Sequence, residues 1–259
     1  MRNPRSIVIT GASSGIGEAL AFAYAAPGIE LALTGRDEAR LSAVAERCRA
    51  AGARVSAARV DSGDRAAMAG WLAERDSAMP IDLIIANAGI ASGTPEGRED
   101  PQLARRTFDV NLTGVLNSVQ PLIEPMIARG RGQIAIMSSL AAFRGFAGSA
   151  AYCASKAAVR IWGEGMRNEL AGYGVEVSVV CPGFVVSRMT AVNKFPMPFL
   201  MQTDRAAAII RRGLERNKSR IAFPLPMAAA VWLLALLPPG WTDRWMRQMP
   251  KIGGRPIKA

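Results

Sequence analysis

The chain has 259 residues, 50% hydrophobic and 20% charged, which is enough to bury the core of one α/β domain and is not typical of a disordered protein. It contains no histidine, which excludes Ser-His-Asp and Cys-His catalysis and every zinc site with a histidine ligand. A formal net charge of +11 is compatible with a nucleic acid, an anionic membrane or a dispersed, solvated surface, and the lack of a dense basic tract over most of the chain favours the last.

Apolar runs of strand length alternate with longer helical patterns along the chain. They predict strands at residues 6–10, 30–34, 54–58, 81–86, 133–137 and 175–180, with a helix ending near residue 26 and another over about 37–51. Near-continuous apolar strands separated by helices indicate a parallel sheet that is covered on both faces. The predicted fold class is therefore α/β, a Rossmann-type doubly wound sheet in three layers, with ligands beyond the carboxyl ends of the strands.

A glycine-containing turn follows the first strand and opens a helix. Its sequence is Thr10-Gly11-Ala12-Ser13-Ser14-Gly15-Ile16-Gly17. Glycines let the backbone turn tightly and approach a pyrophosphate, and the helix N-terminus offers free N–H donors to it. The strand–turn–helix context favours a dinucleotide site over an ordinary tight turn.

The residue that meets the adenosine ribose is expected at the end of the second strand, about 20 residues further on. The chain has Gly35 and then Arg36 there, where an NAD-binding protein usually has an acid. A guanidinium pairs with a 2′-phosphate, which an acid would repel, so we expect NADP(H) in preference to NAD(H). The following Asp37 has the alternative role of capping the next helix.

Tyr152 and Lys156 are four residues apart, on one face of a predicted helix. A free tyrosine has a pKa of about 10, and a nearby ammonium group lowers it, which makes the tyrosine a better acid/base catalyst at neutral pH. Ser138 and Ser139 end the fifth strand, at the edge of the sheet where ligands bind. Either hydroxyl is placed to bind the reacting oxygen, and the 13-residue spacing to Tyr152 favours Ser139.

With these motifs in this order, the chain resembles the short-chain dehydrogenase/reductase family over roughly residues 5–225. The turn at residues 10–17 matches the cofactor turn of the family, and Asp61 matches the acid that contacts adenine, although it also suits a strand-end turn or cap. Further matches are the sheet-steadying motif Asn87, Ala88 and Gly89, the catalytic tetrad Asn111, Ser139, Tyr152 and Lys156, and the nicotinamide segment Pro182, Gly183, Val185 and Ser187.

The resemblance implies a mechanism for carbonyl reduction. The nicotinamide delivers hydride, Tyr152 donates a proton to the oxygen, and Ser139 polarises it. Lys156 is expected to bind the nicotinamide ribose and lower the pKa of Tyr152, while Asn111 holds a water that relays protons. Asn111 has the alternative role of satisfying backbone groups at a helix irregularity.

Residues 184–203 correspond to the substrate lid of the family and contain several Met and Phe residues. They predict an apolar, adaptable pocket, or else a segment that packs on the sheet. We expect an apolar carbonyl or alcohol as substrate, and the family implies a homodimer or homotetramer. Three widely spaced cysteines and no signal peptide predict a cytoplasmic protein with reduced thiols and no metal.

The C-terminus departs from the family pattern, so we divide the chain into a dehydrogenase domain at residues 1–225 and an extension at 226–259. After a candidate strand at 220–223, residues 227–237 are entirely apolar but too few to span a bilayer. Five basic residues and one acid follow Pro239. Residues 227–258 therefore suit peripheral contact with the inner face of the membrane, or helices packed at the substrate pocket or a dimer interface.

The leading function is an oxidoreductase that interconverts a carbonyl and a secondary alcohol with NADP(H). Two alternatives use the same fold: a non-catalytic dinucleotide-binding regulator, and an epimerase or dehydratase. No nucleic-acid recognition motif is present and aromatic residues make up only 6% of the chain, so we expect no nucleic-acid partner.

Overall fold

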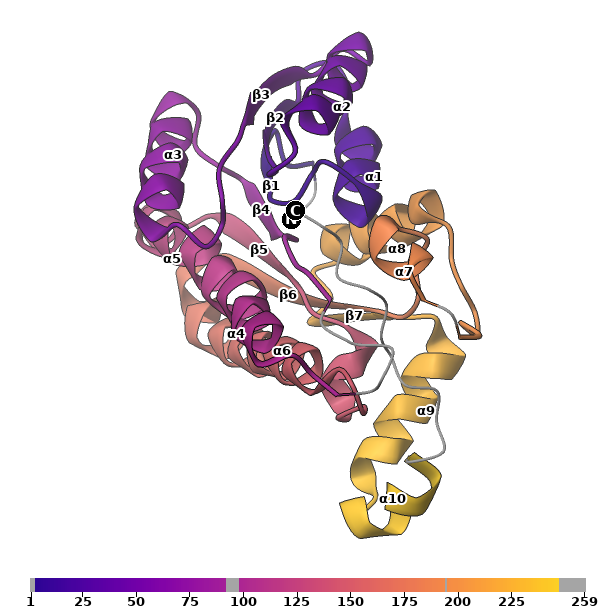
Figure 1. Cartoon of the computed structure of the whole chain (residues 1–259). Coiled ribbons are helices and arrows are strands. Elements are labelled where there is room, and N and C mark those ends of the chain that lie inside the picture. Colours follow the sequence, from indigo (N-terminus) through magenta and orange to yellow (C-terminus); the bar gives the residue numbers. More distant parts are fainter. Residues whose placement is uncertain (1–2, 92–97, 194, 247–259) are drawn as a thin grey trace.

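The computed structural model describes residues 3–91, 98–193 and 195–246, and its centre is a seven-stranded parallel sheet (Figure 1). The strand order is β3-β2-β1-β4-β5-β6-β7, which reverses direction between β1 and β4 and confirms the predicted doubly wound fold. The strands are β1 (Ser6–Ile9), β2 (Glu30–Thr34), β3 (Arg54–Ala58), β4 (Leu83–Ala86), β5 (Gly132–Met137), β6 (Val175–Pro182) and β7 (Arg220–Phe223).

Helices connect the strands and cover both faces of the sheet (Figure 1). They are α1 (Gly15–Tyr24), α2 (Glu38–Ala50), α3 (Arg65–Ala78), α4 (Pro101–Phe108), α5 (Gly114–Ala128), α6 (Ala150–Leu170), α7 (Arg188–Ala191), α8 (Thr203–Glu215), α9 (Leu225–Leu236) and α10 (Pro239–Met246). A π-helical turn at Asp109–Thr113 joins α4 to α5, and short 3₁₀ turns lie at Leu140–Phe143 and Ala171–Tyr173.

The side chains of the central strands alternate between two large cores, one on each face of the sheet. Ile7 and Ile9 of β1 pack on one face with Leu20 of α1, Val44 of α2 and Ile210 of α8. This face is the one covered by α1, α2 and α8 in Figure 1. Because successive strand residues point to opposite faces, the residue between the two isoleucines belongs to the other core.

The second core lies between the sheet and α3, α5 and α6. Val8 of β1 and Ile84 of β4 pack here with Leu72 of α3, Val119 of α5 and Val159 of α6. Burial on both faces is the physical reason why the strands are almost continuously apolar in the sequence.

The start of β4 differs from the prediction by two residues. The apolar run at 81–86 predicts a strand from residue 81, but β4 begins at Leu83. The backbone N–H of Ile81 donates instead to the Asp76 carboxylate of α3, at 2.8 Å, so residue 81 closes the end of the helix and does not join the sheet.

The C-terminal extension forms two helices, α9 and α10, which project from the body of the domain (Figure 1). α9 packs through Met227, Ala228 and Val231 on a small third core that contains Leu140 and Cys181. Within the described residues, no helix combines the length and the apolar character that crossing a bilayer requires.

Candidate active site

The carboxyl end of β1 continues into the glycine turn that the sequence predicts as a phosphate site. Gly11 and Gly15 have φ angles of 66° and 62°, in the left-handed region that glycine adopts without strain. A Cβ on Gly17 would stand 2.4 Å from the Gly11 carbonyl oxygen, so only glycine lets the first turn of α1 approach the loop this closely. The turn thus exposes backbone at the N-terminus of α1, the arrangement that binds phosphates.

The Asn87–Gly89 segment holds this turn against the end of β4. The Asn87 side-chain amide donates to the carbonyl oxygens of Thr10 and Gly11, at 3.0 and 3.2 Å. The Thr10 hydroxyl accepts from the backbone N–H groups of Asn87 and Ala88, at 3.0 and 3.1 Å. These four bonds cross-link two strand ends, and this is the sheet-steadying role that the resemblance implies for the segment.

The Tyr152–Lys156 face of α6 lies next to the serines that end β5. The Ser139 side chain hydrogen-bonds with Tyr152 and accepts from the N–H of Ala141 at 3.1 Å. Ser138 is buried and donates to the Lys156 carbonyl oxygen at 2.7 Å. Of the two serines, Ser139 is therefore the one paired with the tyrosine.

Burial controls the ionisation of this pair. Lys156 is 3% exposed and its ammonium group donates to the Met137 carbonyl oxygen at 2.9 Å. Desolvation lowers the pKa of Lys156 to about 8. Desolvation also raises the pKa of Tyr152, an effect that the hydrogen bond from Ser139 opposes.

The raised pKa differs from the sequence-based expectation that Lys156 would lower the pKa of Tyr152. The Lys156 Nζ lies 6.0 Å from the centroid of the tyrosine ring and is directed at a backbone carbonyl. The cost of burying the charged phenolate is the largest effect on this pKa, and the net shift is upward.

Asn111 occupies the π-helical turn between α4 and α5 and is completely buried. Its Oδ1 accepts from the N–H of Ile90 at 2.8 Å, and its Nδ2 donates to the Ile90 carbonyl at 2.9 Å and to the Ser155 hydroxyl at 3.2 Å. A Cβ on Gly89 would stand 3.1 Å from the Asn111 Oδ1 and 3.2 Å from the Lys156 Nζ. The asparagine thus satisfies backbone groups at a helix irregularity and also lies beside the lysine.

At the ribose end of the site, a glycine follows the last residue of β2, and arginines lie nearby. A Cβ on Gly35 would stand 3.0 Å from that of Ser13, so a larger residue would press on the glycine turn. Arg36 is exposed. Asp37 caps α2 by accepting from the Arg40 N–H at 3.0 Å and pairs with the Arg40 guanidinium at 2.6 Å, which confirms the capping alternative.

A cavity of about 370 Å³ adjoins this end of the turn. It is lined by Ser13, Ser14, Gly15, Glu18, Arg40, Ala43, Val44, Arg47, Val186, Ser187, Arg188 and Thr203. Three arginines around exposed helix N–H groups fit a diphosphate. The sequence analysis did not single out Arg40, Arg47 or Arg188, although Arg40 lies one helical turn after Arg36 and Arg188 directly follows Ser187.

Asp61 follows the end of β3, and its side chain is exposed. Its carboxylate accepts from the N–H of Gly63 at 2.9 Å, which is the strand-end turn considered as its alternative role. This bond involves one of the two carboxylate oxygens, so it is compatible with a contact between Asp61 and adenine.

The segment after β6 lies across the glycine turn. Gly183 donates its N–H to the Phe223 carbonyl at 2.7 Å, next to Pro182 at the strand end. Ser187 caps α7 in a reciprocal pair with Thr190, and its Cβ is 3.3 Å from the place where a Cβ on Gly15 would stand. The predicted nicotinamide segment and phosphate turn therefore face each other.

A family model for short chain dehydrogenases matches residues 5–195. The chain belongs to the short-chain dehydrogenase family. An oxidoreductase of Myxococcus xanthus, described as uncharacterized, is 37% identical over 246 residues, which cover 95% of this chain and 97% of that protein. An uncharacterized oxidoreductase of Mycobacterium tuberculosis is 34% identical, covering 93% of this chain and 97% of that protein.

Solved structures agree with this assignment. A short-chain dehydrogenase from Sphingobium yanoikuyae in complex with NADPH has a TM-score of 0.79 and 28% identity, and 98% of each chain is covered. A putative NAD(P)-dependent gluconate 5-dehydrogenase from Beutenbergia cavernae with bound NADP has a TM-score of 0.76 and 27% identity, covering 89% of this chain and 97% of that one. The protein is thus an oxidoreductase of the class that acts on CH–OH groups.

The lid segment of this short-chain dehydrogenase is divided between core and surface. Val185 is 4% exposed and pairs with Met201 in a short parallel bridge, and both belong to the core beneath α8. Phe184 and Phe195 stack edge to face, with ring centroids 5.8 Å apart, while Phe199 is exposed. Part of the segment therefore packs on the sheet and part remains at the surface.

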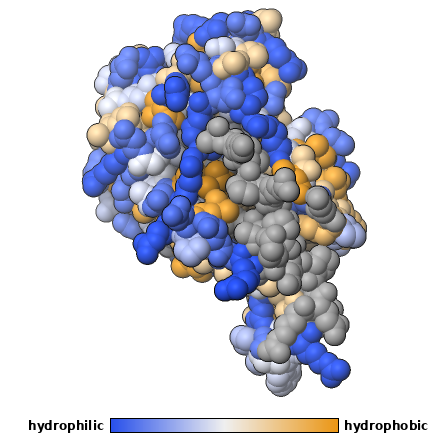
Figure 2. Space-filling model, in the orientation of Figure 1, coloured by the Kyte–Doolittle hydropathy of each residue, from blue (hydrophilic) through white to orange (hydrophobic). Residues whose placement is uncertain are grey.

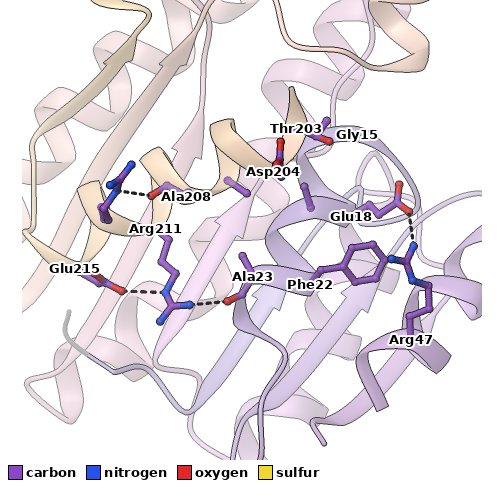
Figure 3. A pocket seen from close by; sticks show the side chains of 13 residues that line it. Gly15, Glu18, Phe22, Ala23, Arg47, Thr203, Asp204, Ala208, Arg211 and Glu215 are labelled. Atoms are coloured by element: carbon purple, nitrogen blue, oxygen red, sulfur yellow. Dashed lines mark hydrogen bonds and ion pairs between the residues drawn. The ribbon is translucent and has the colours of Figure 1, made fainter. Parts of the chain in front are cut away.

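A second cavity of this dehydrogenase, about 900 Å³, is a groove between α1, α2 and α8 that Tyr152 does not line (Figure 3). Its charged side chains engage the protein itself. The Arg47 guanidinium lies 3.9 Å above the Phe22 ring, and Arg211 donates to the carboxylate of Glu215 at 2.9 Å and the Ala23 carbonyl at 2.7 Å. Because Ser139, Tyr152 and Lys156 do not line this groove, it is not the reaction site.

Proposed function

We propose that the protein reduces a carbonyl to a secondary alcohol, or oxidises the alcohol, with NADP(H) as hydride carrier and Tyr152 as acid/base. The observation that carries the proposal is the Ser139–Tyr152 hydrogen bond at the end of β5, with Lys156 one helical turn further along α6. The glycine turn after β1 and the cationic cavity beside it give the cofactor a place at the same edge of the sheet.

The ionisation of the site favours the direction of reduction. NADPH, when bound, supplies the hydride to the carbonyl carbon. The pKa of Tyr152 is raised by burial, so its phenol is protonated at neutral pH and is ready to donate to the developing alkoxide. Ser139 orients the same oxygen by hydrogen bonding.

After this transfer the phenolate needs a proton. Lys156, with a pKa of about 8, exchanges protons near neutral pH and stabilises the transient phenolate. Asn111 lies next to the Lys156 Nζ, beside Gly89. In this proposal Asn111 binds the first member of a proton relay that runs from Lys156 to solvent. The lysine would also bind the nicotinamide ribose.

Preference for NADP(H) rests on Arg36 at the ribose end, with Arg40 as a second cation. The S. yanoikuyae relative in complex with NADPH supports the same cofactor. Arg36→Ala is expected to weaken NADPH binding about ten- to a hundredfold, because a charge-assisted phosphate contact is lost, and to leave NADH binding nearly unchanged. Arg105→Ala, an exposed arginine on α4, is the control.

An apolar substrate fits the surroundings of the site. Figure 2 shows hydrophobic surface in a hollow near the middle of the face in view, and the lid contributes Phe184, Phe195 and Phe199. We also propose that the protein is cytoplasmic and forms a homodimer or homotetramer. Light scattering of the purified protein tests the oligomeric state.

The test of function combines cofactor binding with turnover. Binding of NADPH and NADH is measured by fluorescence, and NADPH consumption is followed with a panel of apolar and polar carbonyls. Tyr152→Phe is expected to bind NADPH like the wild type and to lose at least about a hundredfold in kcat. Tyr173→Phe, an exposed tyrosine after α6, should retain full turnover.

The outcomes separate the alternative functions. NADPH binding without consumption on any carbonyl would favour a regulator, or an epimerase or dehydratase that returns its hydride. Full activity in Tyr152→Phe would contradict the proposed acid/base role. A protein that binds neither cofactor would refute the proposal as a whole.

A further inference from the structure

The helical hairpin α9–α10 exposes an unusual amount of apolar surface. Leu225, Trp232, Leu233, Leu236 and Trp241 have exposed fractions of 75%, 51%, 57%, 62% and 79%. We call these five side chains the apolar stripe. In a water-soluble helix such residues normally face the core, so their exposure on a projecting element marks an interaction surface.

The helical geometry gives α9 two distinct sides. Met227, Ala228 and Val231 pack on the third core of the domain. The exposed Leu225, Trp232 and Leu236 recur at a spacing of seven and four residues, which aligns them along one side of the helix, next to the side that packs on the domain. α9 carries no charged residue, so it has no polar side of its own to turn toward water.

The hairpin is fixed to the domain and does not hang free of it. Arg144 donates to the Leu237 carbonyl at 3.3 Å and to the Thr242 hydroxyl, and so joins the end of α9 and the start of α10 to the turn that follows Ser139. Leu140 of that turn packs against α9. The hairpin that carries the apolar stripe is therefore tied to the domain at both of its helices.

Charge distinguishes between the kinds of partner that would cover the stripe. Beyond Pro239 the sequence has five basic residues, Arg244, Arg247, Lys251, Arg255 and Lys258, and one acid, Asp243. A second copy of the chain would bring two such clusters together on molecules that each carry a formal charge of +11. An anionic surface attracts both the cluster and the whole chain.

We propose that α9–α10 docks this protein on an anionic lipid surface, with the apolar stripe inserted at the headgroup level and the positive charge of the chain attracting it to the lipid phosphates. At about 1.5 Å per residue, the 12 residues of α9 extend about 18 Å, which suits a helix lying in the interface and not one crossing it. Tryptophans such as Trp232 and Trp241 favour that depth.

The attachment has a consequence for catalysis that rests on the proposed function. Leu140, next to Ser139, packs on α9, and Met227 of α9 has its sulfur 2.8 Å from the place where a Cβ on Gly183 would stand. Docking through the outer side of α9 therefore brings this wall of the active site close to the lipid. An apolar carbonyl dissolved in the bilayer would reach the site without crossing water.

Vesicle flotation of the full-length protein, without cofactor or substrate, tests the docking independently of any enzymatic activity. The vesicles are phosphatidylcholine with and without phosphatidylglycerol. The wild type should float with the anionic vesicles, and Trp232→Glu and Leu236→Glu should each reduce partitioning at least about tenfold. Tyr173→Glu replaces an aromatic residue of similar exposure, 53%, elsewhere on the surface and should float like the wild type.

A fourth variant isolates the electrostatic contribution. Replacing Arg247, Lys251, Arg255 and Lys258 with glutamine should remove the preference for phosphatidylglycerol, and added salt should weaken wild-type binding. Unchanged thermal unfolding and NADPH binding of each variant would show that the fold is intact. A wild type that fails to float, or stripe variants that float normally, would overturn the proposal. So would a wild-type dimer that the stripe substitutions dissociate.

Discussion

Replacing the buried Lys156 with methionine should stabilise the protein at neutral pH while abolishing turnover. Lys156 is 3% exposed, and burial lowers its pKa from 10.5 to about 8. That difference corresponds to about 3 kcal/mol of unfavourable free energy in the folded state whenever the side chain is protonated. Methionine has a similar length and fills the site without a charge.

The net effect is smaller than this desolvation cost, because the substitution also removes the hydrogen bond from Nζ to the Met137 carbonyl. A bond of that kind contributes about 1 kcal/mol. At pH 7 we therefore expect Lys156→Met to unfold with a free energy about 2 kcal/mol higher than the wild type.

The sign of the pH dependence follows from proton counting. Between about pH 8 and 10.5 the unfolded wild type holds the lysine proton and the folded wild type does not, so wild-type stability rises with pH relative to the variant. The advantage of Lys156→Met should be complete below pH 8 and disappear near pH 10.5. The buried thiol of Cys48, whose pKa is raised to about 11, does not interact with Lys156, so its titration is the same in both proteins and cancels in the difference.

Urea unfolding of both proteins, at about pH 7, 8, 9 and 10, measures the difference in their free energies of unfolding across the titration of Lys156. A variant less stable than the wild type at pH 7, by an amount that does not change with pH, would refute the claim that the buried ammonium is costly. A stabilised variant that has lost NADPH turnover would show that the site is maintained at the expense of folding stability.

Three further outcomes follow from contacts in the site. Gly17→Ala should lower stability by about 1–3 kcal/mol, because its Cβ would stand 2.4 Å from the Gly11 carbonyl oxygen, whereas Gly70→Ala in α3, with open space around it, should raise the melting temperature. Asn111→Ala should lower the free energy of unfolding by about 2–3 kcal/mol, and with it the urea midpoint, because it removes three hydrogen bonds made by a completely buried side chain; an unchanged midpoint would contradict this. The kcat for carbonyl reduction should fall above about pH 8, as Lys156 loses its proton, and a rate that stays flat to pH 10 would exclude the lysine from the proton relay.

The sheet was predictable because its strands carry one dominant physical signal. β1, β4 and β5 are buried on both faces, so apolar residues have to fill almost every position, and helices have to separate the strands. The predicted start of β4 at residue 81 was wrong, and the reason is a contact that the sequence pattern does not encode. An isoleucine there has the same apolar character as one in the strand, and only the carboxylate of Asp76, on a neighbouring helix, takes its N–H out of the ladder.

The site was predictable in its residue types and less so in its electrostatics. The spacing of Tyr152 and Lys156 indicates that they share a helix face, but not that the ammonium is directed at the Met137 carbonyl. The direction of the tyrosine pKa depends on that orientation and on burial, and neither is encoded in a four-residue spacing. Arg40 was missed for a similar reason, since its place in the cavity depends on how α2 packs beside the glycine turn.

The surroundings of the C-terminal hairpin could not be predicted from its composition. An apolar helix can be buried in a core or can face lipid, and residues 227–237 read the same in either setting. The fold shows which residues pack: α9 contacts the domain through Met227 and Val231, whereas Trp232 and Leu236 are exposed. The lipid surface that we propose would account both for the exposed side of α9 and for the basic residues that follow Pro239 in the sequence.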